Sequence, residues 1–143
     1  MWIFLNDTFV PEDQARISVF DHGFLYGDGV YETLRAYHGQ FFLLERHLVR
    51  LRQSCQLIGL DLPIREKQWP ILLQETLRRN ELTDAAVRIT ISRGKGDFGL
   101  DPSLCPRPTM VIMAKPFRPY PPTLKKEGVR LEIVEVRRNP ISA

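Results

Sequence analysis

Residues 30 to 37, VYETLRAY, alternate between two sets of side chains, and this alternation is the feature that most constrains the fold. The two sets are Val30, Glu32, Leu34 and Ala36, and Tyr31, Thr33, Arg35 and Tyr37. A period of two is that of a β-strand with one buried face. The preceding GFLYGDG is rich in glycine, which predicts tight bends or a close approach of the backbone just before this strand.

The period becomes that of a helix after a turn at residues 38–40. The apolar positions, spaced four, three, four and three apart, are Leu44, Leu48, Leu51, Cys55 and Ile58. They form one stripe on a helix that is expected to end near Gly59. A second helix is expected at about residues 66–79, with Pro70 in its first turn and Asn80 as a left-handed stop.

Further strands are expected on both sides of these helices. They are a hairpin at residues 2–5 and 8–10 with a polar turn, a return arm at 41–44, and strands at 87–92 and 109–114. Residues 109–114 have apolar side chains on both faces, which is typical of a central strand. The sequence therefore predicts an α/β domain of the α+β type, with a mostly antiparallel sheet and two helices packed on one side.

Four prolines in PFRPYPP, residues 116–122, predict an extended interdomain linker. The chain is then divided into an N-terminal small domain at 1–115 and the start of a second domain at 123–143. Residues 129–134 have the composition of one strand, and a lone strand can neither bury its faces nor pair its edges. We therefore expect one whole domain and the beginning of another.

Composition excludes several classes of protein. With 143 residues, of which 43% are hydrophobic, the chain can bury one core. Its 20 basic and 17 acidic residues are interspersed, which does not favour nucleic-acid binding. The apolar run at the N-terminus is too short for a signal peptide or a membrane span, so a cytoplasmic protein is expected. Cys55 and Cys105 form no CxxC pair and are expected to be free thiols.

The usual chemical motifs are absent from the sequence. The glycine-rich RGKGDFG at 93–99 lacks the GxxxxGK[ST] pattern of a phosphate-binding loop. His22, His38 and His47 do not have metal-ligand spacing, and there is no GxSxG. We therefore predict no metal site and no serine nucleophile.

The face with Tyr31, Thr33, Arg35 and Tyr37 suggests a binding site. Phenols and a guanidinium together suit an anionic group, because guanidinium grips a carboxylate with a planar fork. An ordinary edge strand with amphipathic side chains would show the same pattern, so both interpretations stay open at this point.

The run DHGFLYGDGVYETLRAYHGQFFLLERHLVRL, residues 21–51, closely resembles the class IV aminotransferases, which use pyridoxal phosphate in fold type IV. The resemblance continues through ISRG at 91–94 and GLDP at 99–102 to RRNPISA at the end. The family includes branched-chain amino acid aminotransferase, D-amino acid aminotransferase and aminodeoxychorismate lyase. The chain is most similar to the branched-chain type, although the first block does not choose among the three.

The resemblance also implies roles for individual residues. Arg50, in HLVRL, would bind the cofactor phosphate, while Tyr31, Thr33 and Arg35 would face the substrate. Arg88 matches the arginine of a Tyr-x-Arg substrate motif, with Ala86 standing at the tyrosine position. The loop at 94–101 resembles one that reaches a neighbouring subunit in relatives, which implies a homodimer.

The family's Schiff-base lysine would lie a few residues beyond the segment matching RRNPISA. The resemblance therefore implies that these residues are the N-terminal portion of an enzyme moving an amino group from an amino acid to a 2-oxo acid, and that they are inactive alone. The alternatives are an aminodeoxychorismate lyase, a D-amino acid aminotransferase, and a non-catalytic domain for binding or dimerisation.

Overall fold

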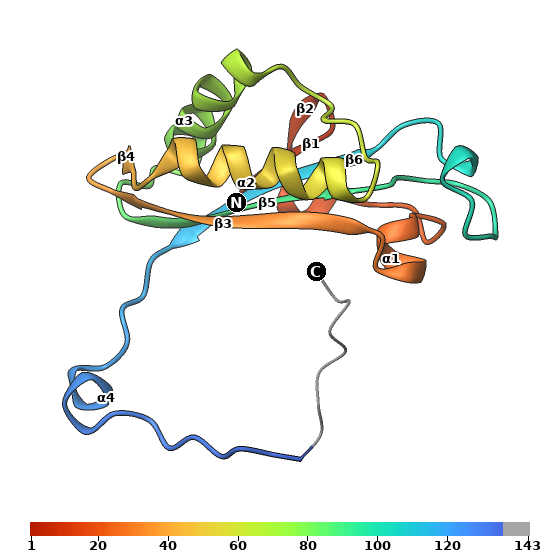
Figure 1. Ribbon diagram of the computed structural model, residues 1–143. Coiled ribbons are helices and arrows are strands. Elements are labelled where there is room, and N and C mark those ends of the chain that lie inside the picture. The colour runs from red at the N-terminus through yellow and green to blue at the C-terminus, as the bar shows by residue number, and fades with distance from the viewer. Residues whose placement is uncertain (136–143) are drawn as a thin grey trace.

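The computed structural model describes residues 1–135, which form a six-stranded antiparallel sheet with two long helices on one face (Figure 1). The strand order is β2-β1-β6-β5-β3-β4. The strands are β1 (Trp2–Leu5), β2 (Thr8–Pro11), β3 (Gly29–Tyr37), β4 (Gln40–Phe41), β5 (Ala85–Ser92) and β6 (Thr109–Pro116). The helices are α1 (His22–Tyr26), α2 (Leu44–Leu57), α3 (Trp69–Arg79) and α4 (Pro122–Glu127). The predicted fold class and the central place of β6 are confirmed.

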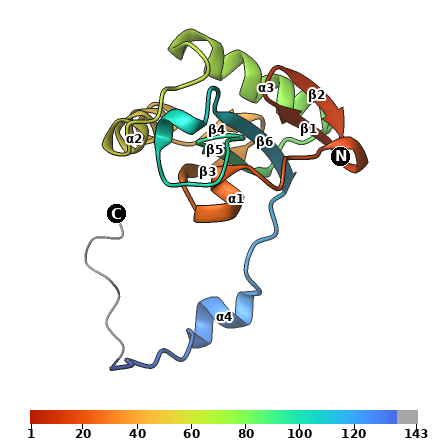
Figure 2. The ribbon, with the colours of Figure 1, turned by 90° about the vertical axis from the view of Figure 1, so that its right-hand side faces the viewer.

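The core lies between the sheet and the helices α2 and α3, which cover the same face (Figure 2). Its most deeply buried side chains are Leu34, Leu51, Cys55, Trp69, Leu73, Leu77, Val87, Ile89, Ile91 and Ile112. The apolar stripe predicted for α2 is confirmed at Leu48, Leu51 and Cys55. Its last member, Ile58, is instead the C-cap of the helix and remains 37% exposed.

Helix α3 ends at Arg79, as predicted, but Asn80 does not take the left-handed conformation that was expected. Asn80 has a φ of −98°, and the left-handed residue is Glu81, with a φ of 53°. Asn80 instead ends the helix through its side chain, whose Oδ1 accepts a hydrogen bond from the Trp2 backbone at 2.8 Å. Its Nδ2 donates to the carbonyl oxygens of Trp2 and Thr76, both at 2.9 Å. The asparagine therefore joins α3 to β1.

The second arm of the β3 hairpin is shorter than predicted. His38 and Gly39 both have positive φ, which is the two-residue turn that matches the twist of a hairpin. Only Gln40 and Phe41 pair with β3, because Leu43 takes a φ of 52° and redirects the chain into α2. The return arm predicted at 41–44 is confirmed at Phe41 but does not reach Leu44, and most of β3 keeps a free edge beneath α2.

The glycine-rich stretch before β3 contains the short helix α1, which the sequence pattern does not predict. Asp21 caps this helix by accepting a hydrogen bond from the Gly23 backbone at 2.8 Å. Gly27 ends it with a φ of 70°. Gly29 passes so close to β5 that a Cβ atom there would lie 2.7 Å from the carbonyl oxygen of Ile91. The predicted bends and close approach are confirmed.

The strand predicted at 129–134 is wrong. Residues 128–135 have no regular structure, and α4, which was not predicted, precedes them. Leu131 and Ile133 are 86% and 99% exposed, because no strand within residues 1–135 lies beside this segment to pair with it. After β6 the chain runs away from the sheet (Figure 1). Residues 136–143 lie outside the described residues, and the division into two domains stays a prediction.

Three further features of the fold are the state of the cysteines, the clustering of metal-ligand residues and the length of the helices. Cys55 and Cys105 are free thiols, as predicted. Within residues 1–135 no three His, Cys, Asp or Glu residues gather closely enough to hold a metal ion. No helix in that part of the chain has both the length and the apolar character needed to cross a membrane.

Candidate functional site

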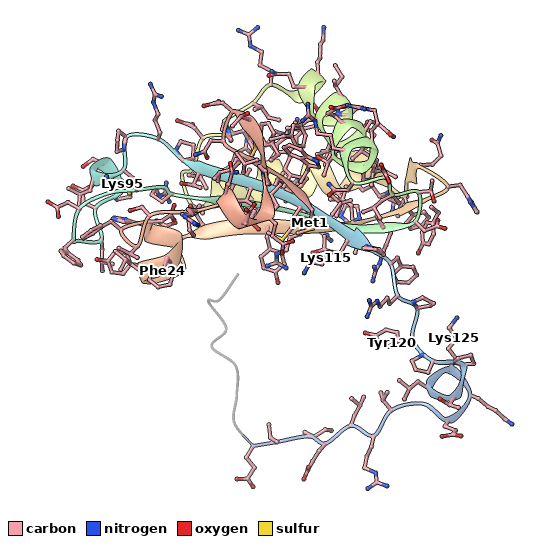
Figure 3. The ribbon with its side chains drawn as sticks, turned by 180° about the vertical axis from the view of Figure 1, so that it is seen from behind. Met1, Phe24, Lys95, Lys115, Tyr120 and Lys125 are labelled. Atoms are coloured by element: carbon pink, nitrogen blue, oxygen red, sulfur yellow. The ribbon has the colours of Figure 1, made fainter. Side chains whose placement is uncertain are left out.

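The open face of the sheet, opposite α2 and α3, carries all four residues predicted to contact substrate. Thr33 of β3 lies directly across from Arg88 of β5, and Arg35 lies across from Ala86. Tyr31 is two residues from Thr33 on the same face of β3. Figure 3 shows that Lys115, which pairs with Ala86, lies on the side away from the helices. The register thus brings the four predicted residues together.

Both arginines of the open face place their guanidinium groups over aromatic rings. The guanidinium carbon of Arg88 is 3.7 Å from the centroid of the Tyr31 ring, and that of Arg35 is 4.0 Å from the Phe117 ring. Neither arginine forms an ion pair with any carboxylate of residues 1–135. Stacking holds each guanidinium in place and leaves its N–H groups free for an anion.

A pocket of about 370 Å³ lies beside Tyr31 on the same open face. Its floor is formed by β3, β5 and β6, and one wall is formed by α1. Its lining surface is mostly apolar, with four hydroxyls and one carboxylate, and the residues that form it are Ile17, Asp21, Gly23, Phe24, Gly27, Gly29, Val30, Tyr31, Thr90, Ser92, Thr109 and Val111. The pocket therefore offers room for an aliphatic group next to the stacked Arg88.

The opposite face of β3 carries a charged cluster formed by Glu32, His47 and Arg50. Glu32 lies among the buried positions of the strand, and its side chain is only 5% exposed. Arg50 Nε and Nη2 donate to the two carboxylate oxygens of Glu32, the second at 2.6 Å. His47 Nδ1 lies 2.8 Å from Glu32 Oε2 and donates to it, since an ionised carboxylate can only accept.

The cluster keeps Glu32 ionised despite its burial. Burial acts to raise the pKa of Glu32, but the hydrogen bonds from Arg50 and His47 outweigh it and hold the pKa below its ordinary value. The same carboxylate raises the pKa of Arg50. Arg50 itself is 64% exposed, and its Nη1 makes no hydrogen bond within the described residues. One edge of the guanidinium is thus held and the other faces solvent.

A second pocket, of about 460 Å³, runs along the free edge of β3 and is called the Arg50 pocket below. It is lined by residues from both faces of β3 and from one side of α2, which are Gly29, Val30, Tyr31, Glu32, Thr33, Arg50, Ser54, Leu57 and Ile58. The pocket therefore connects the free edge of the Arg50 guanidinium with Tyr31 and Thr33 of the open face. An anion held by Arg50 would lie beside the open face of the sheet.

No lysine of residues 1–135 lines the Arg50 pocket. Lys95 lies in the loop after β5, and Lys125 lies on α4 away from the sheet (Figure 3). Lys115 is on β6, separated from β3 by β5.

Glu32, His47 and Arg50 form a cluster that sequence reasoning did not assemble. Arg50 was singled out alone, while Glu32 was grouped with the aliphatic face of its strand. A charged residue at a buried strand position is itself a signal, because burial of a carboxylate requires partners. His47 and Arg50, three residues apart on α2, are those partners, but only the packing of α2 over β3 shows the match.

Comparison with known proteins identifies the family of the chain. The family described as amino-transferase class IV matches residues 29–143. A Methanocaldococcus jannaschii protein named "Putative branched-chain-amino-acid aminotransferase" is 46% identical over 99% of this chain and 48% of its own length. The aminodeoxychorismate lyase of Bacillus subtilis is 34% identical over 96% of this chain and 46% of its own. The chain thus spans about half the length of these relatives.

Solved structures share the fold of the chain. A branched-chain aminotransferase from Thermoproteus uzoniensis, solved with norvaline, matches with a TM-score of 0.73 and 31% identity, over 84% of this chain and 42% of that one. A T.th. branched-chain amino acid aminotransferase, complexed with N-(5'-phosphopyridoxyl)-L-glutamate, matches with a TM-score of 0.76 and 26% identity. The second match covers 81% of this chain and 40% of that one.

Proposed function

Because the chain belongs to the class IV aminotransferase family, we propose that it supplies the cofactor-phosphate and substrate-carboxylate contacts of a pyridoxal phosphate-dependent aminotransferase. The observation that carries the proposal is the Glu32–Arg50 ion pair. It holds an arginine by one edge at the rim of a pocket and leaves the other edge free. A dianionic phosphate fits that free edge, since guanidinium binds phosphate through a planar fork.

Arg50 binds the cofactor phosphate in this proposal, and Glu32 and His47 keep its guanidinium in one orientation. The resemblance to a structure solved with a phosphopyridoxyl compound supports this assignment. Bound pyridoxal phosphate supplies the electron sink for breaking a bond at the substrate's α-carbon. Proton transfer at that carbon needs a lysine beside the cofactor, and none of the residues that line the Arg50 pocket is a lysine. We therefore propose that residues 1–143 alone do not catalyse amino transfer.

The open face holds the substrate in this proposal. Tyr31, Thr33, Arg35 and Arg88 bind carboxylate groups of an amino acid and of a 2-oxo acid. The two arginines are both stacked and both without a carboxylate partner among residues 1–135. Each can therefore accept an anion without first breaking an ion pair, and the two together suit a substrate with two carboxylates.

A branched-chain amino acid is the favoured amino donor. The pocket beside Tyr31 is mostly apolar and lies next to the stacked Arg88, so an aliphatic side chain and a carboxylate can be bound together. Ala86, which pairs with Arg35, stands at the position of the family's tyrosine, and this departure from the branched-chain motif keeps the aminodeoxychorismate lyase alternative open. A D-amino acid aminotransferase is the remaining enzymatic alternative.

A cytoplasmic homodimer is also part of the proposal. Exposed apolar side chains lie on residues 19–24, which lead into α1, and on the loop after β5, and they are Val19, Phe20, Phe24, Phe98 and Leu100. The rings of Phe20 and Phe98 lie 5.5 Å apart and join the two segments into one surface. An apolar surface of this kind supports burial against a second subunit.

The test uses the protein in its full natural length, purified and loaded with pyridoxal phosphate. Amino transfer from leucine to 2-oxoglutarate is compared with transfer from D-alanine and with pyruvate release from aminodeoxychorismate. Transfer from leucine alone supports the favoured function, and either other product reassigns the enzyme. Absence of all three products, together with no absorbance band from bound cofactor, would reject catalysis and favour a binding or dimerisation domain.

A further inference from the structure

Arg93, the residue after β5, has a guanidinium that is almost fully buried and hydrogen-bonded through all three of its nitrogens. Its side chain is 8% exposed. Nε and Nη2 donate to the two carboxylate oxygens of Asp28 at 2.8 and 3.0 Å. Nη1 donates to the carbonyl oxygen of Gly59, and Nη2 to that of Ile58, both at 2.7 Å. We call this set of four bonds the Arg93 clamp.

The Arg93 clamp joins three segments that are far apart in the sequence. Asp28 immediately precedes β3, Arg93 immediately follows β5, and the two carbonyls lie at the C-terminal end of α2. The hydrogen bonds that Arg93 donates to Asp28 raise the pKa of Arg93, and a cation at this end of a helix is favourable. The segments cannot separate without leaving a buried guanidinium unpaired, which is costly.

The clamp lies at one end of the Arg50 pocket. Ile58 lines the pocket from α2, and Gly29, the neighbour of Asp28, lines it from β3. The Glu32–Arg50 ion pair lies further along the same pocket. Helix α2 is therefore tied to β3 at two places, each with one buried charged side chain, which is Glu32 in the ion pair with Arg50 and Arg93 in the clamp. The clamp bonds the C-terminal end of α2 to the residue that precedes β3.

We propose that Arg93 is a positioning residue for the phosphate site, acting through α2 on the placement of Arg50. This inference rests on the proposed function of the Arg50 pocket. Arg93 does not line the pocket, so it has no direct contact with a bound phosphate. Its effect comes from the position of α2, the helix that carries Arg50 and Ser54.

The test compares Arg93→Met and Asp28→Asn with the unmodified full-length protein. Pyridoxal phosphate is titrated into each apoprotein, and its dissociation constant is read from the cofactor absorbance. Both variants are expected to raise the dissociation constant about tenfold. Loss of a residue that orients a ligand-binding side chain has an effect of this size at metal sites. Arg93→Lys, which keeps the charge but lacks the fork, is expected to fall between them and the unmodified protein.

A second readout follows α2 directly. Amide hydrogen exchange should speed up in the C-terminal half of α2 in Arg93→Met, and saturating cofactor should restore kcat to within about twofold of the unmodified enzyme. The matched control is Arg52→Met, which removes an arginine of the same helix whose pair with Glu66 is exposed. This control is expected to leave the dissociation constant unchanged.

Several outcomes would overturn the inference. An unchanged dissociation constant in folded Arg93→Met does so, as does an equal loss in Arg52→Met. Where Arg93→Met does not fold, Asp28→Asn decides, because Asp28 is 28% exposed and asparagine keeps its volume. If the unmodified protein binds no pyridoxal phosphate, the proposed function fails and the inference fails with it. If the unmodified protein binds it and the clamp variants bind it equally well, only the inference fails.

Discussion

Glu32 and Arg50 form an ion pair with two hydrogen bonds in which the carboxylate is buried and the guanidinium is largely exposed. The carboxylate lies on the helix-facing side of β3, and the arginine reaches it from α2. An exposed arginine ordinarily samples many rotamers. Here the buried partner restricts it, so that its free edge is presented to the Arg50 pocket in one orientation.

Glu32→Gln is expected to weaken pyridoxal phosphate binding by about tenfold, because a neutral amide cannot accept from Arg50 and His47 together as a carboxylate does. The measurement is a cofactor titration of the full-length apoprotein. The matched control is Glu45→Gln, which changes an exposed carboxylate of α2 and should not change the affinity. Equal affinities for Glu32→Gln and the unmodified protein would show that Arg50 needs no orienting partner.

The stabilisation from Glu32 is expected to depend on pH. Its pKa is lower in the folded protein than the ordinary value of 4.5, because the hydrogen bonds from Arg50 and His47 outweigh burial. The stabilisation is therefore full above the ordinary value and is lost as the pH falls through the folded-state pKa. The Tm difference between the unmodified protein and Glu32→Gln, measured from about pH 7 to about pH 3, should narrow at the acidic end. A Tm difference that stays constant over this pH range would contradict the lowered pKa of Glu32.

Arg35→Met and Arg88→Met are each expected to raise KM for the 2-oxo acid about tenfold in the full-length enzyme, with a smaller effect on kcat. Each removes one guanidinium from the open face and leaves the Arg50 cluster intact. Steady-state kinetics with 2-oxoglutarate and with a monocarboxylic 2-oxo acid separate the two arginines, since one of them should matter only for the second carboxylate. Arg78→Met, on the exposed side of α3, is the control, and identical effects on both oxo acids would contradict a two-carboxylate site.

Asn80→Ala is expected to lower the free energy of unfolding by about 1–3 kcal/mol, because it removes two hydrogen bonds that join α3 to Trp2 of β1 and one to the Thr76 carbonyl at the end of α3. Asn80→Gly distinguishes this cause from a conformational one. Glycine would restore stability if a left-handed residue were needed, but the φ of −98° means that it should not. Chemical denaturation of both variants measures the difference. Recovery in Asn80→Gly would refute the side-chain explanation.

Gly94→Ala is expected to destabilise the protein more than Gly27→Ala. Both glycines have positive φ, 97° and 70°, so the conformational cost of alanine is similar at the two positions. A Cβ atom at Gly94 would overlap the carbonyl oxygen of Arg107, whereas at Gly27 it would meet nothing within 4 Å. Thermal unfolding of the two variants ranks them. The reverse order would mean that the loop at 94–108 rearranges to make room.

Much of the fold could be predicted from local pattern. The alternation of residues 30–37 and the apolar stripe on α2 arise because some side chains face the core and others do not. Both periods can be recognised from the order of neighbouring residues. The errors occurred where the pattern was interrupted. Positive φ at Leu43 shortened the return arm, and the side chain of Asn80, rather than its backbone, ended α3. The strand predicted at 129–134 has no neighbour to pair with within residues 1–135.

The family, the alternating strand face and the residues that the family resemblance implies for binding could all be inferred before any coordinates. The sequence alone could not show which charged residues form pairs. Glu32 with Arg50, and Asp28 with Arg93, are 18 and 65 residues apart, and no local period relates them. These pairs depend on the packing of α2 over the free edge of β3 and on the β3–β5 register. Buried charges must find partners, but the chain path through the fold chooses which partners they find.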